Sequence, residues 1–480
     1  MTSVTRREIA ALGAILIAAG AIRIVTAGYS LWFDELASLV FAHQPIGRLW
    51  SGWMIRESNP PLYYSLLRVW IGAFGESDRV VRLLSILIGL GGIVAGWALA
   101  RRLGGATAGL IAAALLSFSA SHVAFSQEAR SYVLAHGATL VALLGTADIL
   151  DHRRRGLLVY AVATLVALYS HTTMIVFALL TAVTVAVLLR QFPRAFAEWL
   201  ATNVVIAIGW AWWASISLSQ MVAPHTNFDW IKQPSIRDAV DQTAIAYLPT
   251  FLAEIWPAGA VLLTGLAMVV AFVVRRDRRP IVVLLAVLVF VGPMTLFALS
   301  QIKPIFLYRT IYWANGPVTV LVALFVAGLA PSPARRRILI ALLATEALFM
   351  AAWLAFWQLE EWPSALDAIA SVDPHAVVLV EGDAMALAAA HYRPAASNLR
   401  IVELRPRSAQ FDSWAQGLYH GTHVDAAGAA ALLKARGRVF SLTRHGHDPS
   451  WALRAVGLDQ PWTIASHGRK PLVWVWRARS

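Results

Sequence analysis

Two adjacent carboxylates, Asp34 and Glu35, follow the first hydrophobic run of the chain, within the stretch YSLWFDELAS at residues 29–38. Only 14% of the residues are charged, so two neighbouring acids beside Trp32 and Phe33 need an explanation. They could mark a helix start, where the helix dipole favours acidic side chains. Alternatively, one of them could accept a proton from a hydroxyl group while the other orients a partner or binds a cation.

A second group of polar residues surrounds a Pro-Pro turn in the stretch RESNPPLYY at residues 56–64. The two prolines fix the backbone and force the chain to turn before a new helix begins. A helix-entry turn alone does not explain why Glu57, Asn59, Tyr63 and Tyr64 are crowded around it. We treat Glu57, Asn59 and Tyr63 as candidates for substrate binding.

A third candidate loop is SQEARSY at residues 126–132, which carries Glu128 and Arg130. The two side chains could form an exposed ion pair of little energetic value. If Glu128 instead lies at the same membrane face as Asp34, it is a further acid of one site. A cluster of three carboxylates could hold a divalent cation through oxygen ligands.

Later loops add groups that suit an anion. His171, in YSHTT, could hydrogen-bond a phosphate or a sugar hydroxyl, or it could be a structural histidine. Lys303 and Arg309, in SQIKPIFLYRTIYW, could reach toward lipid headgroups or capture a phosphate. Acids and cations at one membrane face suit group transfer from a lipid phosphate. The carboxylate would deprotonate an acceptor hydroxyl, and the cations would stabilise the departing phosphate.

The elements that must position these groups are membrane helices. With 58% hydrophobic residues and a mean hydropathy of +0.62, the chain is too apolar for an ordinary soluble protein. Apolar runs of roughly 20 residues, long enough to cross a bilayer, recur along it. We predict a polytopic α-helical membrane protein with about eleven transmembrane helices. The predicted spans are 9–27, 81–100, 104–123, 132–150, 157–170, 172–189, 198–217, 255–274, 280–299, 311–330 and 338–357.

The net charge of +13 reflects membrane topology rather than nucleic-acid binding. Arginines cluster in alternate short loops, whereas the intervening loops hold few basic residues, which is the positive-inside pattern. This pattern predicts a multi-pass protein of the plasma or inner membrane, with a cytoplasmic N-terminus and an extracytoplasmic C-terminal segment. The clusters are Arg6–Arg7, Arg101–Arg102, Arg153–Arg155, Arg190 with Arg194, Arg275–Arg279 and Arg335–Arg337.

The predicted domains are a membrane module over residues 1–358, with its catalytic outer loop at 28–80, and an extracytoplasmic α/β domain over 359–480. In the tail, apolar strand candidates alternate with helix-like stretches, which suggests a small, partly parallel sheet. The chain has no cysteine, which excludes thiol catalysis, cysteine metal sites and disulfides.

Five motifs occur in order on these loops: WFDEL, NPPLYY, GESDRVVRLLS, SQEARSY and YSHT. Together they resemble the multi-spanning GT-C glycosyltransferases of family 39 type, which are related to protein O-mannosyltransferases and to the aminoarabinose transferase that modifies lipid A. The resemblance is good over about residues 28–190, looser over the later spans and slight in the tail. It implies a polyprenyl-phosphate sugar donor, an acceptor on a lipid, glycan or protein, and inverting transfer on the outer side of the membrane.

By this resemblance, Asp34 matches the general base of the first outer loop, with Glu35 beside it, and Glu128 matches the acid of the second loop. Arg309 lies where relatives often carry a basic residue that suits the donor phosphate. Many relatives have a histidine or an aspartate near the Pro-Pro turn, where this chain has Glu57 and Asn59. That departure leaves the identity of the sugar and of the acceptor open.

Two other functions fit a polytopic chain with charges at its interface. A transporter or flippase for a lipid-linked glycan should carry ionisable groups near the membrane midplane and show repeated halves. Here the candidate acids lie in outer loops, and no internal repeat is visible. A non-catalytic scaffold for envelope assembly is the other alternative, but the acids of the motifs are intact.

Overall fold

The structure is a computed structural model that describes residues 4–223, 230–247, 258–277, 279–356, 361–405, 419–436, 439–444, 460–462 and 473–477. Contacts divide the chain into two compact units. The first comprises Met1–Ala27, Pro45–Pro224 and Phe228–Phe356, and the second comprises Gly28–Gln44, His225–Asn227 and Trp357–Ser480. The boundary at 358/359 stays a prediction, and the contacts add that residues 28–44 of the outer loop pack with the tail.

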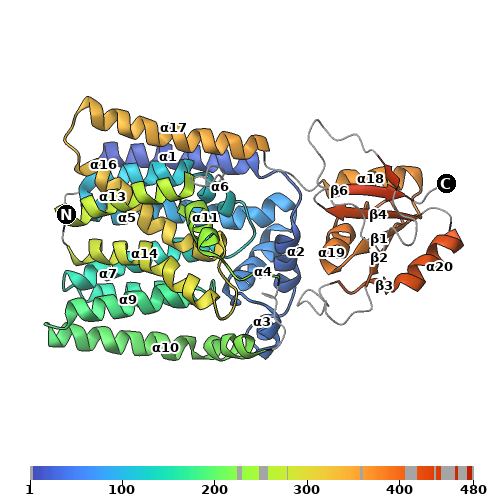
Figure 1. Cartoon of the computed structure of the whole chain (residues 1–480), viewed down its shortest axis with the longest axis horizontal. Helices are drawn as coiled ribbons and strands as arrows, with labels where there is room; N and C mark the ends of the chain where they lie inside the picture. Colours follow the sequence, from blue (N-terminus) through green and yellow to red (C-terminus); the bar gives the residue numbers. More distant parts are fainter. Residues whose placement is uncertain are drawn as a thin grey trace. The chain divides into compact units, whose positions relative to one another are not determined.

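The first unit is a bundle of long apolar helices that run side by side (Figure 1). Its core is built from aliphatic side chains and alanines of these helices. The long helices are α1 (Arg6–Thr26), α5 (Asp78–Phe118), α7 (Tyr132–Leu150), α8 (Arg155–Leu168), α9 (Met174–Leu189), α10 (Pro193–Val222), α13 (Ala258–Arg276), α14 (Pro280–Ser300), α16 (Asn315–Gly328) and α17 (Pro333–Phe356).

Short helices fill the connections at the polar loops. They are α3 (Ile46–Leu49), η1 (Gly52–Arg56), α4 (Leu62–Phe74), α6 (Ala120–Ser126), α11 (Ile236–Tyr247), α15 (Tyr308–Ile311) and η2 (Tyr312–Ala314). The Pro-Pro turn at Pro60 and Pro61 lies directly before α4, as the sequence predicts.

The prediction of a polytopic helical membrane protein with a small C-terminal α/β domain is confirmed. Within the described ranges, seven helices are long and apolar enough to cross a membrane, and α8 and α9 are shorter apolar helices. Each predicted span falls mostly on helical segments, and residues 255–257 and 357 lie outside the described residues. The count of eleven spans stays a prediction.

Helix α5 contains two of the predicted spans. Gly105 interrupts it with a φ of +79°, a backbone conformation that glycine adopts at little cost. A methyl group at Gly96 would approach Leu116 Cδ1 to 2.6 Å, and one at Gly109 would approach the Trp97 carbonyl oxygen to 3.0 Å. The two halves of α5 therefore fold back against each other, and small residues let their backbones come close.

Most of the arginine clusters meet at one end of the bundle. Arg279 donates to the carbonyl oxygen of Leu103, which follows the Arg101–Arg102 cluster. Ion pairs join the other clusters: Arg101 with Glu8, Arg102 and Arg155 with Asp148, and Arg154 and Arg194 with Glu198. This gathering is what the positive-inside pattern requires. The cytoplasmic location of this end stays a prediction.

The second unit contains a six-stranded sheet in the order β3-β2-β1-β4-β6-β5. Strands β1 (Val377–Glu381), β2 (Arg400–Leu404), β3 (Thr422–Val424) and β4 (Val439–Arg444) pair in parallel, whereas β6 (Val473–Arg477) runs antiparallel to β4 and β5 (Gln460–Trp462). Helices α18 (Trp362–Val372), α19 (Asp383–His391) and α20 (Ala426–Arg436) contact the sheet. The partly parallel sheet is thus as predicted.

Helix α2 (Phe33–Ala42) also belongs to the second unit, where it packs against α19. The backbone N–H of Leu31 donates to the hydroxyl of Tyr392, at 2.6 Å. Tyr392 directly follows α19, so this bond ties the start of the outer loop to the tail. The segment that carries Asp34 is therefore held by residues more than three hundred positions away.

Candidate active site

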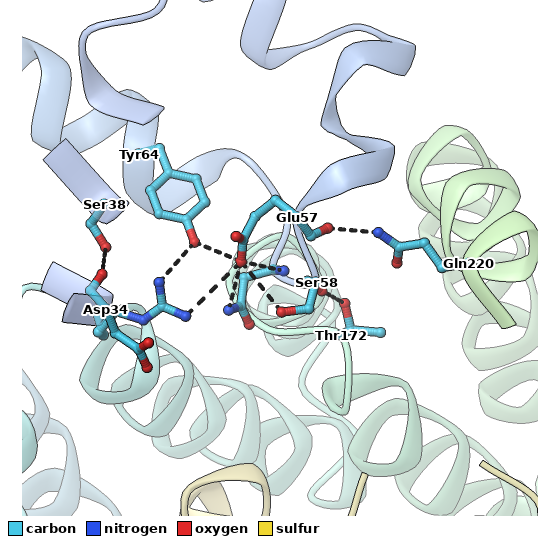
Figure 2. A network of polar contacts seen from close by, with 9 residues as sticks. Asp34, Ser38, Glu57, Ser58, Tyr64, Thr172 and Gln220 are labelled. Atoms are coloured by element: carbon cyan, nitrogen blue, oxygen red, sulfur yellow. Dashed lines mark hydrogen bonds and ion pairs between the residues drawn. The ribbon is translucent and has the colours of Figure 1, made fainter. Parts of the chain in front are cut away.

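A buried carboxylate, Glu57, is the centre of a polar network in the first unit (Figure 2). Its side chain is 1% exposed, and Oε1 accepts hydrogen bonds from the backbone N–H and the Nδ2 of Asn59, at 3.0 and 3.1 Å. The Tyr64 hydroxyl donates to the same oxygen at 3.0 Å, and Ser58 Oγ donates at 3.3 Å. Several donors on one oxygen of a buried carboxylate hold the turn in one shape.

Two neighbouring elements fix the turn from outside. Gln220, on α10, donates from Nε2 to the carbonyl oxygens of Ile55 and Glu57, at 2.8 and 2.7 Å. Thr172, in the connection between α8 and α9, donates to the carbonyl oxygen of Ser58. Because these donors come from a helix and a separate connection, the position of the Glu57 turn is set by the packing of the bundle.

The network contains one cation, Arg130. Its Nη2 lies 4.0 Å from Glu57 Oε1, and its Nη1 donates to the Tyr64 hydroxyl at 3.3 Å. Burial is the main reason that the pKa of Tyr64 is raised well above its ordinary value. The phenol therefore stays protonated and donates to Glu57, while its oxygen accepts from Arg130. Glu57 and Tyr64 together orient the guanidinium group.

The loop that carries Arg130 is anchored to the end of α1. Gln127 donates from Nε2 to the carbonyl oxygen of Arg23, at 2.7 Å. The Arg23 guanidinium in turn donates to the last carbonyl oxygens of α5, those of Leu116 and Ser117, and to His122 Nδ1. A cation at a helix C-terminus is favourable. Three helix ends thus hold this loop.

His171 lies where cations from two loops act on one imidazole. Its ring is buried, and its pKa falls to about 3, mainly because burial disfavours the charged ring and further because of the charges of Arg130 and Arg309. Nδ1 contacts the Thr173 hydroxyl at 2.9 Å, and that hydroxyl donates to the Thr310 carbonyl oxygen at 2.7 Å. Loops 169–173 and 308–311 are therefore joined at a neutral histidine, on which the charges of Arg130 and Arg309 act.

Arg309 and Lys303 come from the connection between α14 and α16. Arg309 lies in α15, and its guanidinium carbon stands 5.2 Å from the ring centroid of Trp230. Such a cation–π contact stabilises the guanidinium without using its hydrogen-bond donors. Lys303 is half-buried in the turn after α14. Of these two cations, Arg309 is the one whose charge lowers the pKa of His171.

Two other predicted residues have different surroundings. Tyr63 is fully buried, and its hydroxyl contacts Ser85 Oγ on α5 at 2.6 Å, so it packs α4 onto α5. Glu128 is half-buried, and its carbonyl oxygen accepts from the Arg130 N–H at 2.7 Å. Glu128 thus shares the tight turn that presents Arg130.

Asp34 and Glu35 lie in the first turn of α2, in the second unit. Glu35 is fully buried, and its Oε2 accepts from the Trp32 backbone N–H at 3.2 Å, so Glu35 caps the start of α2. Asp34 is half-buried, and its carbonyl oxygen accepts from Ser38 Oγ at 3.0 Å (Figure 2). The two adjacent acids therefore do not have the same role.

The three carboxylates considered from the sequence could have formed a cation site. Across the described part of the chain, no group of three or more His, Asp or Glu side chains is arranged to hold a metal ion. The three-carboxylate cluster considered from the sequence is therefore not formed by those residues.

Comparison with known proteins gives a family match to part of the chain and a fold for nearly all of it. Residues 58–213 match the sequence model of the family described as dolichyl-phosphate-mannose-protein mannosyltransferase. The crystal structures of ArnT from Cupriavidus metallidurans, in the apo state and bound to undecaprenyl phosphate, each superpose with a TM-score of 0.61 at 15% sequence identity. The alignment covers 97% and 98% of this chain and 97% of ArnT. No curated protein sequence matches significantly.

The chain is a membrane protein whose fold is similar to that of ArnT, and its residues 58–213 match the mannosyltransferase family model. The family match and the fold confirm the resemblance that the five motifs suggested. The matched region begins at Ser58 in the Pro-Pro turn and includes Arg130 and His171. It ends in α10, before Arg309.

Sequence reasoning missed Gln220 and Thr173, which hold the site, and it did not distinguish Tyr64 from its neighbour Tyr63. Tyr64, rather than Tyr63, contacts Glu57 and Arg130, because adjacent helical residues point about 100° apart. Gln220 lies in an apolar helix, where an amide with two carbonyl partners gives no pattern in the sequence. Thr173 follows His171 closely, and the polar run SHTT was the one available signal.

Proposed function

We propose that the chain transfers a sugar from a polyprenyl-phosphate donor to an acceptor hydroxyl on the extracytoplasmic face of the membrane. The acceptor hydroxyl belongs to a lipid, a glycan or a protein. Two findings on relatives support the donor: the matched family is described by a dolichyl-phosphate sugar, and ArnT has been crystallised with undecaprenyl phosphate.

The convergence of Arg130 and Arg309 on neutral His171 carries the proposal. Two guanidinium groups offer a planar, bidentate match to phosphate oxygens. One ring nitrogen of a neutral imidazole carries a hydrogen and can donate a hydrogen bond to a phosphate oxygen. This set lies away from the arginine-rich end, at loops that the positive-inside pattern predicts to be extracytoplasmic. Lys303, Asn59 and Glu57 border the same loops, with Glu57 orienting Arg130.

In the proposed reaction, the Asp34 carboxylate accepts the proton of the acceptor hydroxyl. The acceptor oxygen then forms a bond to C1 of the sugar as the bond between C1 and the phosphate oxygen breaks. The departing polyprenyl phosphate keeps the electron pair, and Arg130 and Arg309 stabilise its charge. A single displacement of this kind inverts the configuration at C1. Glu35 holds the helix start, and Glu128 supports the loop of Arg130.

The test is sugar transfer in membranes supplied with a radiolabelled polyprenyl-phosphate sugar. Asp34→Asn should abolish transfer while the amount of protein in the membrane stays normal. Glu76→Gln is the matched control, because it removes an exposed carboxylate from the loop before α5 and should leave transfer unchanged. Turnover by Asp34→Asn at the wild-type rate would remove Asp34 from the role of base.

A further inference from the structure

A cavity of about 540 Å³ opens at the arginine-rich end of the bundle, away from the proposed active site. It lies where the connection between α7 and α8 meets the connection between α9 and α10. Its apolar walls are formed by Ile149, Leu157, Phe192, Pro193 and Ala195. Its polar lining consists of His152, Arg153, Arg154, Arg194 and Glu198.

The charges of the lining are unbalanced. Glu198 is the only acid among the lining residues, and both Arg154 and Arg194 pair with it. Arg153 lies 3.6 Å from Asp148, which also pairs with Arg102 and Arg155 and so cannot neutralise each of them. The cavity therefore presents an excess of positive charge to an incoming anion.

The arginine side chains are free to turn toward such an anion. The side chains of Arg153, Arg154 and Arg194 are 44%, 63% and 82% exposed. Exposed ion pairs contribute little to stability, so exchanging one carboxylate for a phosphate costs the fold little. The guanidinium groups can thus rearrange around a ligand without unfolding the helix ends.

The surface next to the cavity is apolar. His152 adopts a φ of +59°, and its ring packs edge-on against Phe192 at 4.8 Å between centroids. Along the two helices that leave this point, Leu158 on α8 and Leu200 on α10 are 71% and 55% exposed. Because this bundle lies in a membrane, these side chains face acyl chains. A ligand here has its anionic part in the cavity and its apolar part along α8 and α10.

We propose that this cavity binds the headgroup of an anionic phospholipid, with the phosphodiester between Arg153, Arg154 and Arg194 and the acyl chains along α8 and α10. Basic pockets between transmembrane helices are suited to such headgroups. This site does not depend on the proposed glycosyltransferase reaction.

The experiment is native mass spectrometry of the purified full chain titrated with phosphatidylglycerol, with phosphatidylcholine as the zwitterionic lipid. We expect phosphatidylglycerol to stay bound and phosphatidylcholine to dissociate. In Arg154→Gln/Arg194→Gln, phosphatidylglycerol should bind about thirty-fold more weakly, since each basic residue near the surface contributes about 1 kcal/mol and about 1.4 kcal/mol is tenfold. Arg336→Gln/Arg337→Gln, which removes the same charge at exposed residues of α17, should bind as the wild type does.

A second variant separates binding from a purely structural role. Glu198→Gln removes the acid that competes for Arg154 and Arg194, so it should tighten phosphatidylglycerol binding several-fold, by roughly one contact of about 1 kcal/mol. Equal binding of both lipids, equal loss in the α17 control, or weaker binding in Glu198→Gln would each overturn the proposal. Displacement of the lipid by millimolar inorganic phosphate would also overturn it, because the site would then recognise free phosphate.

Discussion

Replacing Glu57 by glutamine tests whether this carboxylate holds the proposed anion site together. The substitution keeps the size of the side chain but removes the charge that faces Arg130 at 4.0 Å. Hydrogen bonds to a charged group contribute about 1.5–3 kcal/mol each, against about 0.5–1.5 kcal/mol for neutral pairs. Breaking a buried ion pair by removing one partner costs about 3–5 kcal/mol. We therefore expect Glu57→Gln to lower the free energy of unfolding by about 3–5 kcal/mol.

The assay is thermal unfolding of the purified protein in detergent, together with donor binding. About 1 kcal/mol shifts Tm by about 2–4 °C in domains of moderate size, so a loss of about 3–5 kcal/mol should lower Tm by roughly 6–20 °C. Tyr64→Phe removes one donor from the same oxygen and should cost about 1 kcal/mol. In the double variant, the two effects should be non-additive by about 0.5–3 kcal/mol, because both residues share one network.

The exposed acid Glu76 supplies the control, since Glu76→Gln should change stability by less than about 0.5 kcal/mol. A Glu57→Gln protein that unfolds like the wild type would refute the structural role of the carboxylate. If that protein were also inactive, Glu57 would have to act on the substrate directly. Additive effects of Glu57→Gln and Tyr64→Phe would show that the hydrogen bond between them contributes nothing.

Three further outcomes follow from the same geometry. Arg309→Ala should raise the KM for the donor about 10–100-fold, because one charge-assisted contact is lost, and should leave the acceptor KM unchanged. A raised acceptor KM with an unchanged donor KM would contradict the phosphate role. The pKa of His171 is about 3 in the folded protein, against an ordinary value of about 6.5. His171 therefore contributes its full stabilisation of the fold above about pH 6.5. That stability falls by up to about 1.4 kcal/mol per pH unit as pH drops toward 3, and His171→Gln should remove this slope in urea unfolding. Tyr392→Phe removes the hydroxyl that accepts from the Leu31 N–H. It should lower kcat and speed hydrogen exchange over residues 28–44, with the donor KM unchanged. Unchanged exchange over these residues would show that the bond does not hold the loop.

The membrane fold was predictable because hydropathy acts over consecutive residues. Each apolar run must become a helix to satisfy its backbone in lipid, so runs in the sequence translate directly into spans. The turn at Gly105 splits α5 where two runs meet. The strands of the tail were visible for the same reason, as short apolar runs between turns. The short edge strands β3 and β5 were not, because three residues make no pattern.

The contacts within the site were less predictable because they join residues far apart in sequence. Arg130 meets Glu57, and Thr173 meets the Thr310 carbonyl, only because separate helices pack in one way. The sequence indicated the loops that carry chemistry but not which side chain of a pair faces inward. Tyr63 and Tyr64 show this clearly, as do Asp34 and Glu35. In each pair one residue packs or caps an element, and its neighbour points elsewhere.

The contacts of residues 28–44 within the second unit lead to a prediction about the tail. Residues 28–44 are joined by the chain to α1 and α3 of the first unit, yet they pack with α19 and Tyr392 of the second. The residues of the proposed anion site, Arg130, His171 and Arg309, all belong to the first unit. Changes in the tail should therefore alter the step that needs Asp34 and spare donor binding. If tail variants instead weakened donor binding alone, α2 would not be the route by which the tail acts.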